Sequence, residues 1–407
     1  MPLSEAPASV AVLGGGLAGV TVARQLRQDG YQGELVIVDP EGAPYDRPPL
    51  SKGYLAGQAT AESLLLAPRD WYGEQGIELV TGHVEWLDPS ERRFQLTDGR
   101  QLAAEAVVLA CGARARRLPV PGGDHPALRT LRGRRDADLL RAELAPGTRL
   151  VIVGAGLIGA EVASTALAAG AEVTLVDPAD PPLAQVVGPD LAEVLHTMHR
   201  DRGVRVVTGQ VARVSERGDQ LVLHVDGAEL VADTVLVAVG AVPHTALAEA
   251  AGLDTDHGIL VDAEQRTSAP GVYAAGDCAR RRRPDGTLLP ATEHWDAALH
   301  QGRVVAAALL GQPAPTEPVP WFWSDRHGVH LECVGSVNGP GRTVRRPGPR
   351  GGPESVLRLG PDSALLGCAA VDDPRLVRAA RRLVAAGSPV DERALTDPGV
   401  DPRRLTR

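Results

Sequence analysis

Two segments of the chain combine a short apolar run, a glycine-rich turn and a helical pattern. In the first, the apolar run 10–13 enters the turn GGGLAG at 14–19, and apolar residues then recur at helical spacing to about residue 30. The second segment, RLVIVGAGLIGAEVASTALAAG, repeats this order from residue 149. Both patterns predict a buried strand, a tight turn and a helix.

An acidic residue ends the next predicted strand in both segments. ELVIVDP ends in Asp39, 20 residues past Gly19, and EVTLVDP ends in Asp177, 18 residues past Gly159. Three spaced glycines alone can form a turn that binds nothing, but this strand, helix and acid context is typical of dinucleotide sites. The predicted contact positions are Gly14, Gly16, Ala18, Gly19 and Asp39 in the first site, and Gly154, Gly156, Ile158, Gly159 and Asp177 in the second.

The acids also predict which nucleotide is preferred. A carboxylate at Asp39 or Asp177 accepts a hydrogen bond from a ribose hydroxyl and repels a 2′-phosphate. The following segment, 178–190, contains no arginine that could hold such a phosphate. The second site is therefore expected to prefer NADH to NADPH.

A further apolar strand, Val272 to Ala275, leads into Gly276 and Asp277. Ligands of open parallel sheets bind at the carboxyl ends of the strands. Asp277 is therefore a candidate contact to the ribityl or pyrophosphate part of a bound cofactor, and a turn-capping aspartate is the alternative interpretation. The Pro-rich stretch GQPAPTEPVPWFW, starting at residue 311, predicts a linker into a last domain.

Length and composition restrict the possible classes of protein. A chain of 407 residues is expected to form two or three domains. Its net charge of −9 argues against general nucleic-acid binding, and no apolar run reaches the roughly 18 residues of a membrane span. We find no signal-peptide pattern, and four scattered cysteines without a CxxC argue against a zinc ribbon or a dithiol pair. These features predict a cytoplasmic protein.

The segment PYDRPPLSKGYL contains Lys52, the single lysine beside 41 arginines. With GGGLAG, LACGARARRLPVPG, GAGLIGAE, AVGAVPHTALAEAAGL, GVYAAGDCA, EHWDAALHQG and WFWSD, it resembles the FAD-dependent NADH:ferredoxin reductases of oxygenase systems, of the putidaredoxin reductase and biphenyl dioxygenase reductase type. This resemblance covers almost the whole chain. It implies an α/β fold with two Rossmann-like dinucleotide-binding domains, as in glutathione reductase, and a C-terminal α+β domain.

The resemblance also implies domain boundaries and cofactors. Residues 1–118 and 239–318 are expected to form the FAD-binding domain, 119–238 the NAD-binding domain and 319–407 the C-terminal reductase domain. NADH would transfer hydride to FAD, and the flavin would pass single electrons to a [2Fe–2S] ferredoxin, with a [3Fe–4S] ferredoxin as the alternative. That ferredoxin would supply a P450 or a Rieske oxygenase.

Lys52 and Glu161 are the predicted catalytic residues. In the family, the lysine of this motif lies beside the flavin, where a compact cation stabilises the negative charge that hydride transfer creates. The resemblance implies that Glu161, two residues past Gly159, faces Lys52 and is displaced or reoriented by nicotinamide. A surface lysine without a role is the alternative interpretation of Lys52.

Further contacts follow from position within the family motifs. The resemblance implies that Arg47 and Arg132 lie near the flavin or its phosphates and that the backbone of Val84 contacts the adenine end. It also implies that Glu293 and Trp295 begin a helix that points at the flavin ring and that Gly240 lies near nicotinamide. Trp323 is expected to cover the flavin and mark the electron exit, with a core tryptophan as the alternative.

Two alternative functions stay open on the sequence. An NADH oxidase, peroxidase or disulfide reductase could use the same fold, but the absence of a cysteine before Cys111 argues against the cysteine-dependent members. An NADH-sensing flavoprotein of the apoptosis-inducing-factor type is the second alternative. For a ferredoxin, the candidate docking arginines are the run 280–283 and the group Arg342, Arg345 and Arg346; solvated arginines without a partner are the competing interpretation.

Overall fold

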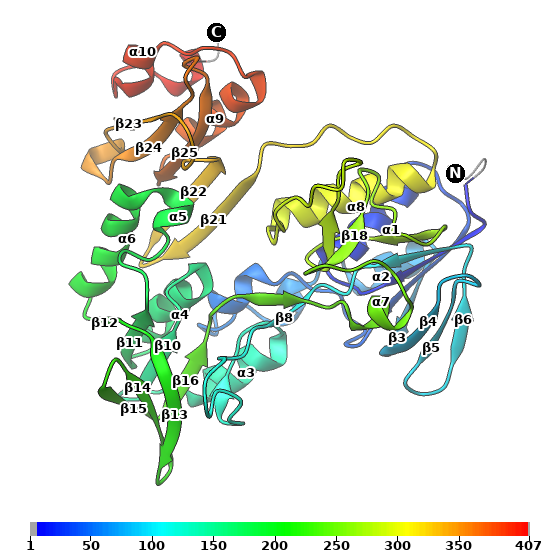
Figure 1. The fold of residues 1–407 in the computed structure, drawn as a ribbon, viewed down its shortest axis with the longest axis horizontal. Helices are drawn as coiled ribbons and strands as arrows, with labels where there is room; N and C mark the ends of the chain where they lie inside the picture. The colour runs from blue at the N-terminus through cyan, green and yellow to red at the C-terminus, as the bar shows by residue number, and fades with distance from the viewer. Residues whose placement is uncertain (1–5, 406–407) are drawn as a thin grey trace. The chain divides into compact units, whose positions relative to one another are not determined.

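The computed structural model describes residues 6–405, which divide into two compact units (Figure 1). Unit 1 contains the chain up to residue 46 with 61–114 and 241–317, and unit 2 contains 47–60, 115–240 and the chain from 318 onward. The short segment 47–60, which carries Lys52, thus belongs to unit 2 although the chain on both sides of it belongs to unit 1.

Unit 1 is built on a parallel sheet with the strand order β19-β7-β1-β2-β3. The central strands β1, β7 and β19 are short apolar runs in which nearly every side chain is buried, as expected for a parallel sheet covered on both faces, and β2 and β3 are partly exposed. Their bounds are β1 Ser9–Leu13, β2 Glu34–Asp39, β3 Ile77–Thr81, β7 Ala106–Leu109 and β19 Val272–Ala274.

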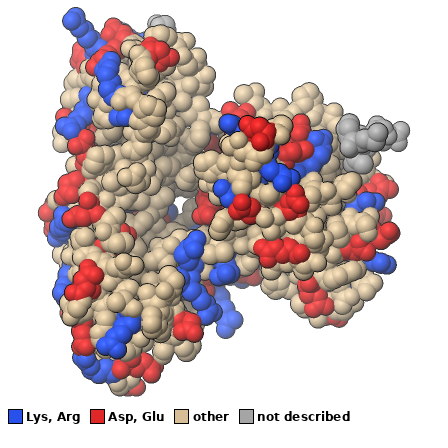
Figure 2. Space-filling view, in the orientation of Figure 1, with Lys and Arg blue, Asp and Glu red and all other residues tan. Residues whose placement is uncertain are grey.

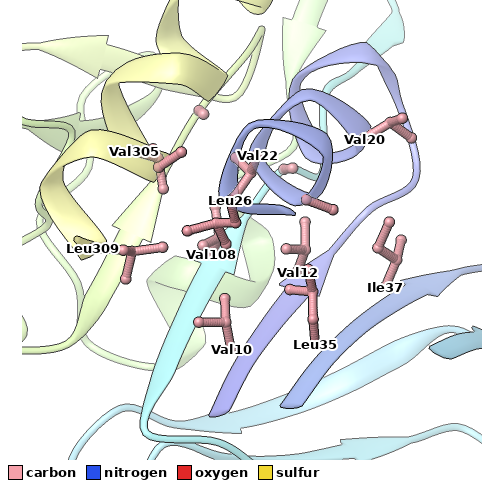
Figure 3. Packing of buried hydrophobic residues seen from close by; sticks show 14 of the residues in the cluster. Val10, Val12, Val20, Val22, Leu26, Leu35, Ile37, Val108, Val305 and Leu309 are labelled. Carbon is pink, nitrogen blue, oxygen red and sulfur yellow. The ribbon is translucent and has the colours of Figure 1, made fainter. Parts of the chain in front are cut away.

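Helices α1 (Leu17–Gln28) and α8 (Trp295–Leu309) cover one face of this sheet (Figure 3). The two helices approach closely because α8 has glycine at 302, where a Cβ would lie 2.7 Å from the carbonyl oxygen of Ala18. The opposite face packs against a small antiparallel sheet, β4 (Val84–Asp88), β5 (Arg93–Leu96) and β6 (Gln101–Ala103), and against α7 (Ala246–Ala250).

Unit 2 contains a second parallel sheet with the order β12-β11-β10-β16-β9. An antiparallel sheet packs on one of its faces through the apolar side chains of both sheets. The parallel strands are β9 Leu128–Arg129, β10 Arg149–Val153, β11 Glu172–Asp177, β12 Arg205–Thr208 and β16 Thr234–Val237; the antiparallel strands are β13 Val211–Arg217, β14 Gln220–Val225 and β15 Ala228–Ala232; the helices are α3 Arg134–Glu143, α4 Leu157–Ala168, α5 Ala184–Val187 and α6 Pro189–Asp201.

The C-terminal part of unit 2 is an antiparallel sheet with the order β21-β22-β25-β24-β23. Helix α9 packs on one face, and residues of α5 and α6 pack on the other. The elements are β21 Trp321–Arg326, β22 Val329–Gly335, β23 Arg342–Arg346, β24 Ser355–Leu359, β25 Leu365–Val371, α9 Pro374–Ala386 and α10 Glu392–Thr396.

Short elements complete the two units. They are α2 Arg69–Glu74, β8 Ala113–Ala115, β17 Ala241–Pro243, β18 Ile259–Val261, β20 Ala279–Arg281, and the 3₁₀ turns η1 Pro48–Ser51, η2 Glu62–Leu64, η3 Pro349–Gly351 and η4 Pro402–Arg404. The Pro-rich stretch between α8 and β21 has neither helix nor strand, in agreement with the predicted linker.

The predicted fold class, α/β with two parallel dinucleotide-type sheets and a C-terminal α+β part, is confirmed. The division into three domains stays a prediction, because the compact units only group the chain into two bodies. Within residues 6–405 we find no helix whose length and hydropathy would let it cross a bilayer.

Candidate functional site

The first glycine-rich turn lies where the strand order of the unit 1 sheet reverses, between β1 and α1. Gly14 has φ +124°, and a Cβ there would lie 2.2 Å from the carbonyl oxygen of Ala110. A Cβ on Gly19 would lie 2.0 Å from the carbonyl oxygen of Gly14, so this glycine allows the helix to approach the strand. A Cβ on Gly16, in contrast, would meet no other described atom within 4 Å. The turn therefore leaves open the position at which a pyrophosphate approaches the backbone.

The second turn, between β10 and α4, repeats this geometry in unit 2. Gly154 has φ +102°, and its Cβ would lie 2.4 Å from the carbonyl oxygen of Ala238. A Cβ on Gly159 would lie 1.9 Å from the carbonyl oxygen of Gly154, whereas one on Gly156 would meet no other described atom within 4 Å. Ile158, in the first turn of α4, is 43% exposed, which is unusual for an isoleucine. Both turns thus fit a dinucleotide.

The two predicted ribose acceptors also hold the turns in place. Asp39 Oδ2 accepts a hydrogen bond from the Gly15 N–H at 3.0 Å, and Asp177 Oδ2 accepts one from the Ala155 N–H at 2.7 Å. This second role of the acids was not part of the sequence prediction. A carboxylate has about four acceptor sites, so each acid can still accept from a ribose hydroxyl.

The other predicted contacts of unit 1 come from the end of β19, from the start of α8 and from the start of β4. Gly276, at the carboxyl end of β19, places Asp277 beside α1, since a Cβ on Gly276 would lie 3.0 Å from the Cβ of Ala18. Trp295 begins α8 and donates from its indole N–H to Asp46 at 3.0 Å. Glu293 is exposed just before this helix.

Val84 begins β4, close to the end of β3. Gly82, two residues earlier, donates its N–H to the Asp39 carbonyl at 3.1 Å. Val84 therefore follows the same carboxyl edge of the sheet that carries Asp39, and its contact with the adenine end stays a prediction.

Three further predicted contacts, Arg47, Arg132 and Gly240, belong to unit 2. Arg47 donates to the carbonyl oxygen of Arg132 at 2.8 Å, so these two arginines, 85 residues apart, lie together. Gly240 follows β16 with φ +104°, and its carbonyl accepts from the Arg116 N–H at 2.9 Å. The roles of these residues stay predictions.

Lys52 and Glu161 form an ion pair within unit 2. The Lys52 ammonium donates to Glu161 Oε2 at 2.8 Å and to the carbonyl of Pro48 at 3.1 Å. Ser51 Oγ also donates to Oε2, at 2.5 Å, and Ser324 Oγ donates to Oε1 at 2.6 Å. The side chain of Glu161 is 5% exposed and that of Lys52 is 20% exposed. A buried carboxylate is tolerated here because a cation and two hydroxyl groups satisfy it.

The segment that carries Lys52 is fixed to the helices of unit 2. Thr165 on α4 donates to the Ser51 carbonyl at 2.9 Å, and Tyr54 donates to Asp138 on α3 at 2.9 Å. The guanidinium of Arg141 lies 5.2 Å from the centre of the Tyr54 ring, within cation–π range. These contacts explain how Lys52 comes to lie beside the second glycine-rich turn.

The sequence prediction did not include Ser51, Ser324 or Arg326. Arg326 donates from Nη2 to Ser324 Oγ at 3.0 Å and is only 3% exposed. Two of these residues stand inside quoted motifs, PLSKG and WFWSD, which could have indicated the serines. Arg326 gave no such signal, because an arginine at the end of a strand in an arginine-rich chain is usually solvated.

The tryptophans of β21 lie on the other side of the C-terminal sheet from Ser324. Trp321 and Trp323 are stacked with ring centres 4.9 Å apart. Side chains alternate along a strand, so Trp321 packs with the α9 face, whereas Phe322 packs with the α6 face. The proposed electron-exit role of Trp323 stays a prediction.

The four cysteines are free thiols, and three of them are buried. Burial raises the pKa of Cys278 to about 11 and that of Cys333 to about 12, so neither is a reactive thiolate near neutral pH. Cys111 lies next to the first turn, where its thiol contacts the Leu13 carbonyl oxygen, and burial strongly raises its pKa as well.

Two parallel sheets with a dinucleotide turn each, and a lysine–glutamate pair at the second turn, define a two-nucleotide oxidoreductase. Comparison with known families agrees with this class. Residues 8–302 match the pyridine nucleotide-disulphide oxidoreductase family, and residues 321–406 match the C-terminal domain of reductases. The chain belongs to the pyridine nucleotide-disulphide oxidoreductase family.

Individual relatives are similar over almost the whole chain. The ferredoxin–NAD(+) reductase subunit of a benzene 1,2-dioxygenase system from Pseudomonas putida is 38% identical, covering 98% of this chain and 97% of the relative. Putidaredoxin reductase from the same species is 39% identical, covering 96% and 95%. The solved covalent putidaredoxin reductase–putidaredoxin complex matches with a TM-score of 0.89 at 36% identity, covering 98% of this chain and 97% of that chain.

These comparisons confirm the family recognised in the sequence and, with it, the prediction of an oxidoreductase that uses FAD and NADH. They do not test individual contact residues, whose roles stay predictions.

Proposed function

We propose that this protein is an NADH:ferredoxin reductase that supplies electrons to an oxygenase system. The observation that carries the proposal is the pairing of two dinucleotide turns, one in each unit, with a buried Lys52–Glu161 pair at the second turn. The names of relatives that match over more than nine-tenths of the chain support ferredoxin as the acceptor. A P450 or a Rieske oxygenase is the proposed final user of the electrons.

The first turn is the proposed FAD site and the second the proposed NADH site. Bound FAD supplies the chemistry of the conversion, because it accepts two electrons with a hydride and releases them one at a time. The chain contributes binding and orientation. Gly16 and Gly156 leave room for the pyrophosphates, and Asp39 and Asp177 accept from the riboses.

Lys52 and Glu161 are the proposed catalytic pair. An ammonium stabilises developing negative charge most strongly where water is scarce, and this lysine is mostly buried. For Lys52 to act on the reacting groups, its bond to Glu161 has to loosen when nicotinamide binds. Two serine hydroxyls remain on the carboxylate when that happens.

The docking face for an acidic ferredoxin is proposed to lie on α9. The arginines considered from the sequence are mostly engaged within the chain, since Arg281 and Arg282 pair with acids and Arg346 is buried against backbone carbonyls. Arg378 and Arg382 are exposed on α9, one turn apart, and form no ion pair with other residues of the described chain. Figure 2 shows charges of both signs over the visible face. A local basic group such as Arg378 and Arg382 is therefore expected to steer an acidic ferredoxin more than the net charge of the protein does.

The first experiment tests the function itself. The purified protein is assayed for NADH-dependent cytochrome c reduction with a panel of [2Fe–2S] and [3Fe–4S] ferredoxins. We expect an absorbance spectrum of bound flavin and fast turnover that requires one of the ferredoxins. Slow turnover with every ferredoxin and a long-lived complex of NAD with the reduced protein would instead favour an NADH sensor. Rapid oxygen consumption without ferredoxin would favour an oxidase.

The second experiment tests the docking face. Replacement of Arg378 and Arg382 by glutamate is expected to lower kcat/KM for ferredoxin about 10-fold at low salt and to weaken its dependence on salt. The control replaces Arg93 and Arg205, which are exposed on other elements, by glutamate and changes the net charge equally. If both double variants lose the same amount, general charge and not α9 is responsible. NADH-dependent ferricyanide reduction should be unchanged in both.

We also propose a cytoplasmic location. The free cysteines support this assignment, because a reducing compartment keeps thiols unpaired.

A further inference from the structure

The carboxylate of Glu161 is held from two sides of unit 2. On one side, Lys52 and Ser51 donate to Oε2 from the 47–60 segment. On the other side, Ser324 donates to Oε1 from β21 of the C-terminal sheet. A second cation lies behind Ser324 on this side: Arg326 hydrogen-bonds to Ser324 and not to Glu161 itself. The cations on the two sides of Glu161 are therefore Lys52, directly after η1, and Arg326 on β21.

The direction of these hydrogen bonds is fixed by the chemistry of the groups. A guanidinium can only donate hydrogen bonds, so the oxygen of Ser324 must accept from Arg326. The single hydroxyl proton of Ser324 is then left to donate to the carboxylate, 2.6 Å away. Arg326 thus orients and polarises the hydroxyl that contacts Glu161.

Burial of the Arg326 guanidinium costs desolvation free energy, which its hydrogen bond to Ser324 and the nearby carboxylates offset only in part. Its side chain lies almost fully inside, and its Nε finds no hydrogen-bond partner in the described structure. Burial lowers the pKa of Arg326 to about 10, although the nearby carboxylates of Glu161 and Asp325 oppose this change. The guanidinium is still protonated at neutral pH. A permanent positive charge therefore lies behind Ser324.

We propose that Arg326, acting through Ser324, is a positioning residue that keeps the Glu161 carboxylate in place and partly neutralised while the Lys52 ammonium leaves it. The role of this step in catalysis rests on the function proposed above. The effect of Arg326 on the opening of the ion pair does not depend on that function. Without a second cation, each opening would leave a buried carboxylate with hydroxyl partners alone, which is strongly unfavourable.

The single lysine makes this opening measurable without any turnover. In the purified, flavin-loaded protein, Lys52 is the one side-chain amine that acetic anhydride can modify. An ammonium held in an ion pair with a carboxylate reacts slowly, so the labelling rate of Lys52 reports how often the pair opens. Peptide mass spectrometry separates this amine from the N-terminal one.

Two variants test the proposal. Arg326→Met removes the second cation, and Ser324→Ala removes the hydroxyl that connects it to Glu161. In both variants, we expect Lys52 to be labelled about 5- to 30-fold more slowly than in the wild type. The Glu161 carboxylate then lacks the effect of the second cation, so opening of its ion pair with Lys52 costs more free energy. Arg326→Lys restores a cation and should recover part of the Lys52 labelling rate; the amine that it adds at position 326 is followed separately on its own peptide. The matched control is Arg346→Met, which removes another buried arginine of the same sheet.

The sign of the change separates the proposal from a merely structural role. If Arg326 only supports packing, its loss loosens the site, and Lys52 is labelled faster. Faster or unchanged labelling in both Arg326→Met and Ser324→Ala, or an equal slowing in Arg346→Met, would overturn the proposal. A protein that reduces no ferredoxin but shows the expected labelling would contradict the proposed function and leave this inference standing.

Discussion

Replacement of Lys52 by methionine is the most direct test of the site. The change removes the ammonium that lies 2.8 Å from Glu161 Oε2 and keeps a side chain of similar length. The carboxylate retains its hydrogen bonds from Ser51 and Ser324. The perturbation therefore concerns one charge and not the packing of η1 against α4.

The structure sets the expected magnitude. Complete loss of the partner of a buried charge costs about 3–5 kcal/mol, and one hydrogen bond to a charged group contributes about 1.5–3 kcal/mol. Since Glu161 keeps two hydroxyl donors and Lys52 is partly exposed, we expect the free energy of unfolding to fall by about 2 kcal/mol. Glu161→Gln in the same background should recover most of this loss, because the buried charge has then been removed as well.

The effect on chemistry should be larger than the effect on stability. Removal of one preorganised charge that stabilises a transition state typically lowers the rate about 100- to 1,000-fold. Lys52→Met is thus expected to bind flavin normally, since the first glycine-rich turn is untouched, and to be reduced by NADH about 100-fold more slowly. Lys52→Arg should recover only part of the rate, because a planar guanidinium does not replace a compact ammonium.

Urea unfolding followed by circular dichroism measures the first effect, and stopped-flow absorbance of the flavin measures the second. A Lys52→Met protein with full flavin content that is reduced within twofold of the wild-type rate would refute the catalytic role. Additive stability changes in the Lys52 and Glu161 variants would refute the energetic coupling of the pair.

Three further predictions concern the nucleotide sites and pH. Gly156→Val should fold normally, because its Cβ has free space, but should raise the KM for NADH at least tenfold; Gly16→Val should instead lower flavin content, and normal values in both would contradict the assigned turns. NADPH should have a higher KM than NADH in steady-state assays, because Asp177 would repel its 2′-phosphate; a lower one would contradict this. Burial lowers the pKa of His199 from 6.5 to about 3, so below pH 6.5 the unfolded chain takes up a proton that the folded chain does not. The contribution of His199 to stability in urea should therefore fall by about 1.4 kcal/mol per pH unit below pH 6.5. The acid-side loss of stability should be smaller in His199→Asn than in the wild type, and the same as in the wild type in His257→Asn, which changes an exposed residue.

Local sequence was sufficient to predict the two dinucleotide turns. Gly14 and Gly154 need positive φ, and Gly19 and Gly159 need closely packed backbone, so the constraint is contained within a few consecutive residues. The strand before each turn and the acid after it belong to the same local pattern. The resemblance of PYDRPPLSKGYL and WFWSD to a known family added the pairing of Lys52 with Glu161, which the structure contains.

The surroundings of that pair depended on tertiary structure. Ser51, Glu161 and Ser324 are separated by more than 100 residues in the sequence and meet because η1, α4 and β21 pack together in unit 2. No local pattern indicates that Arg326, one of 41 arginines, is buried whereas Arg378 is exposed. Burial and the partners of a charge are properties of the packed chain, since both depend on which distant segments cover the side chain. The sequence determined where the nucleotide turns form, and the tertiary structure decided which charges surround the carboxylate beside the second turn.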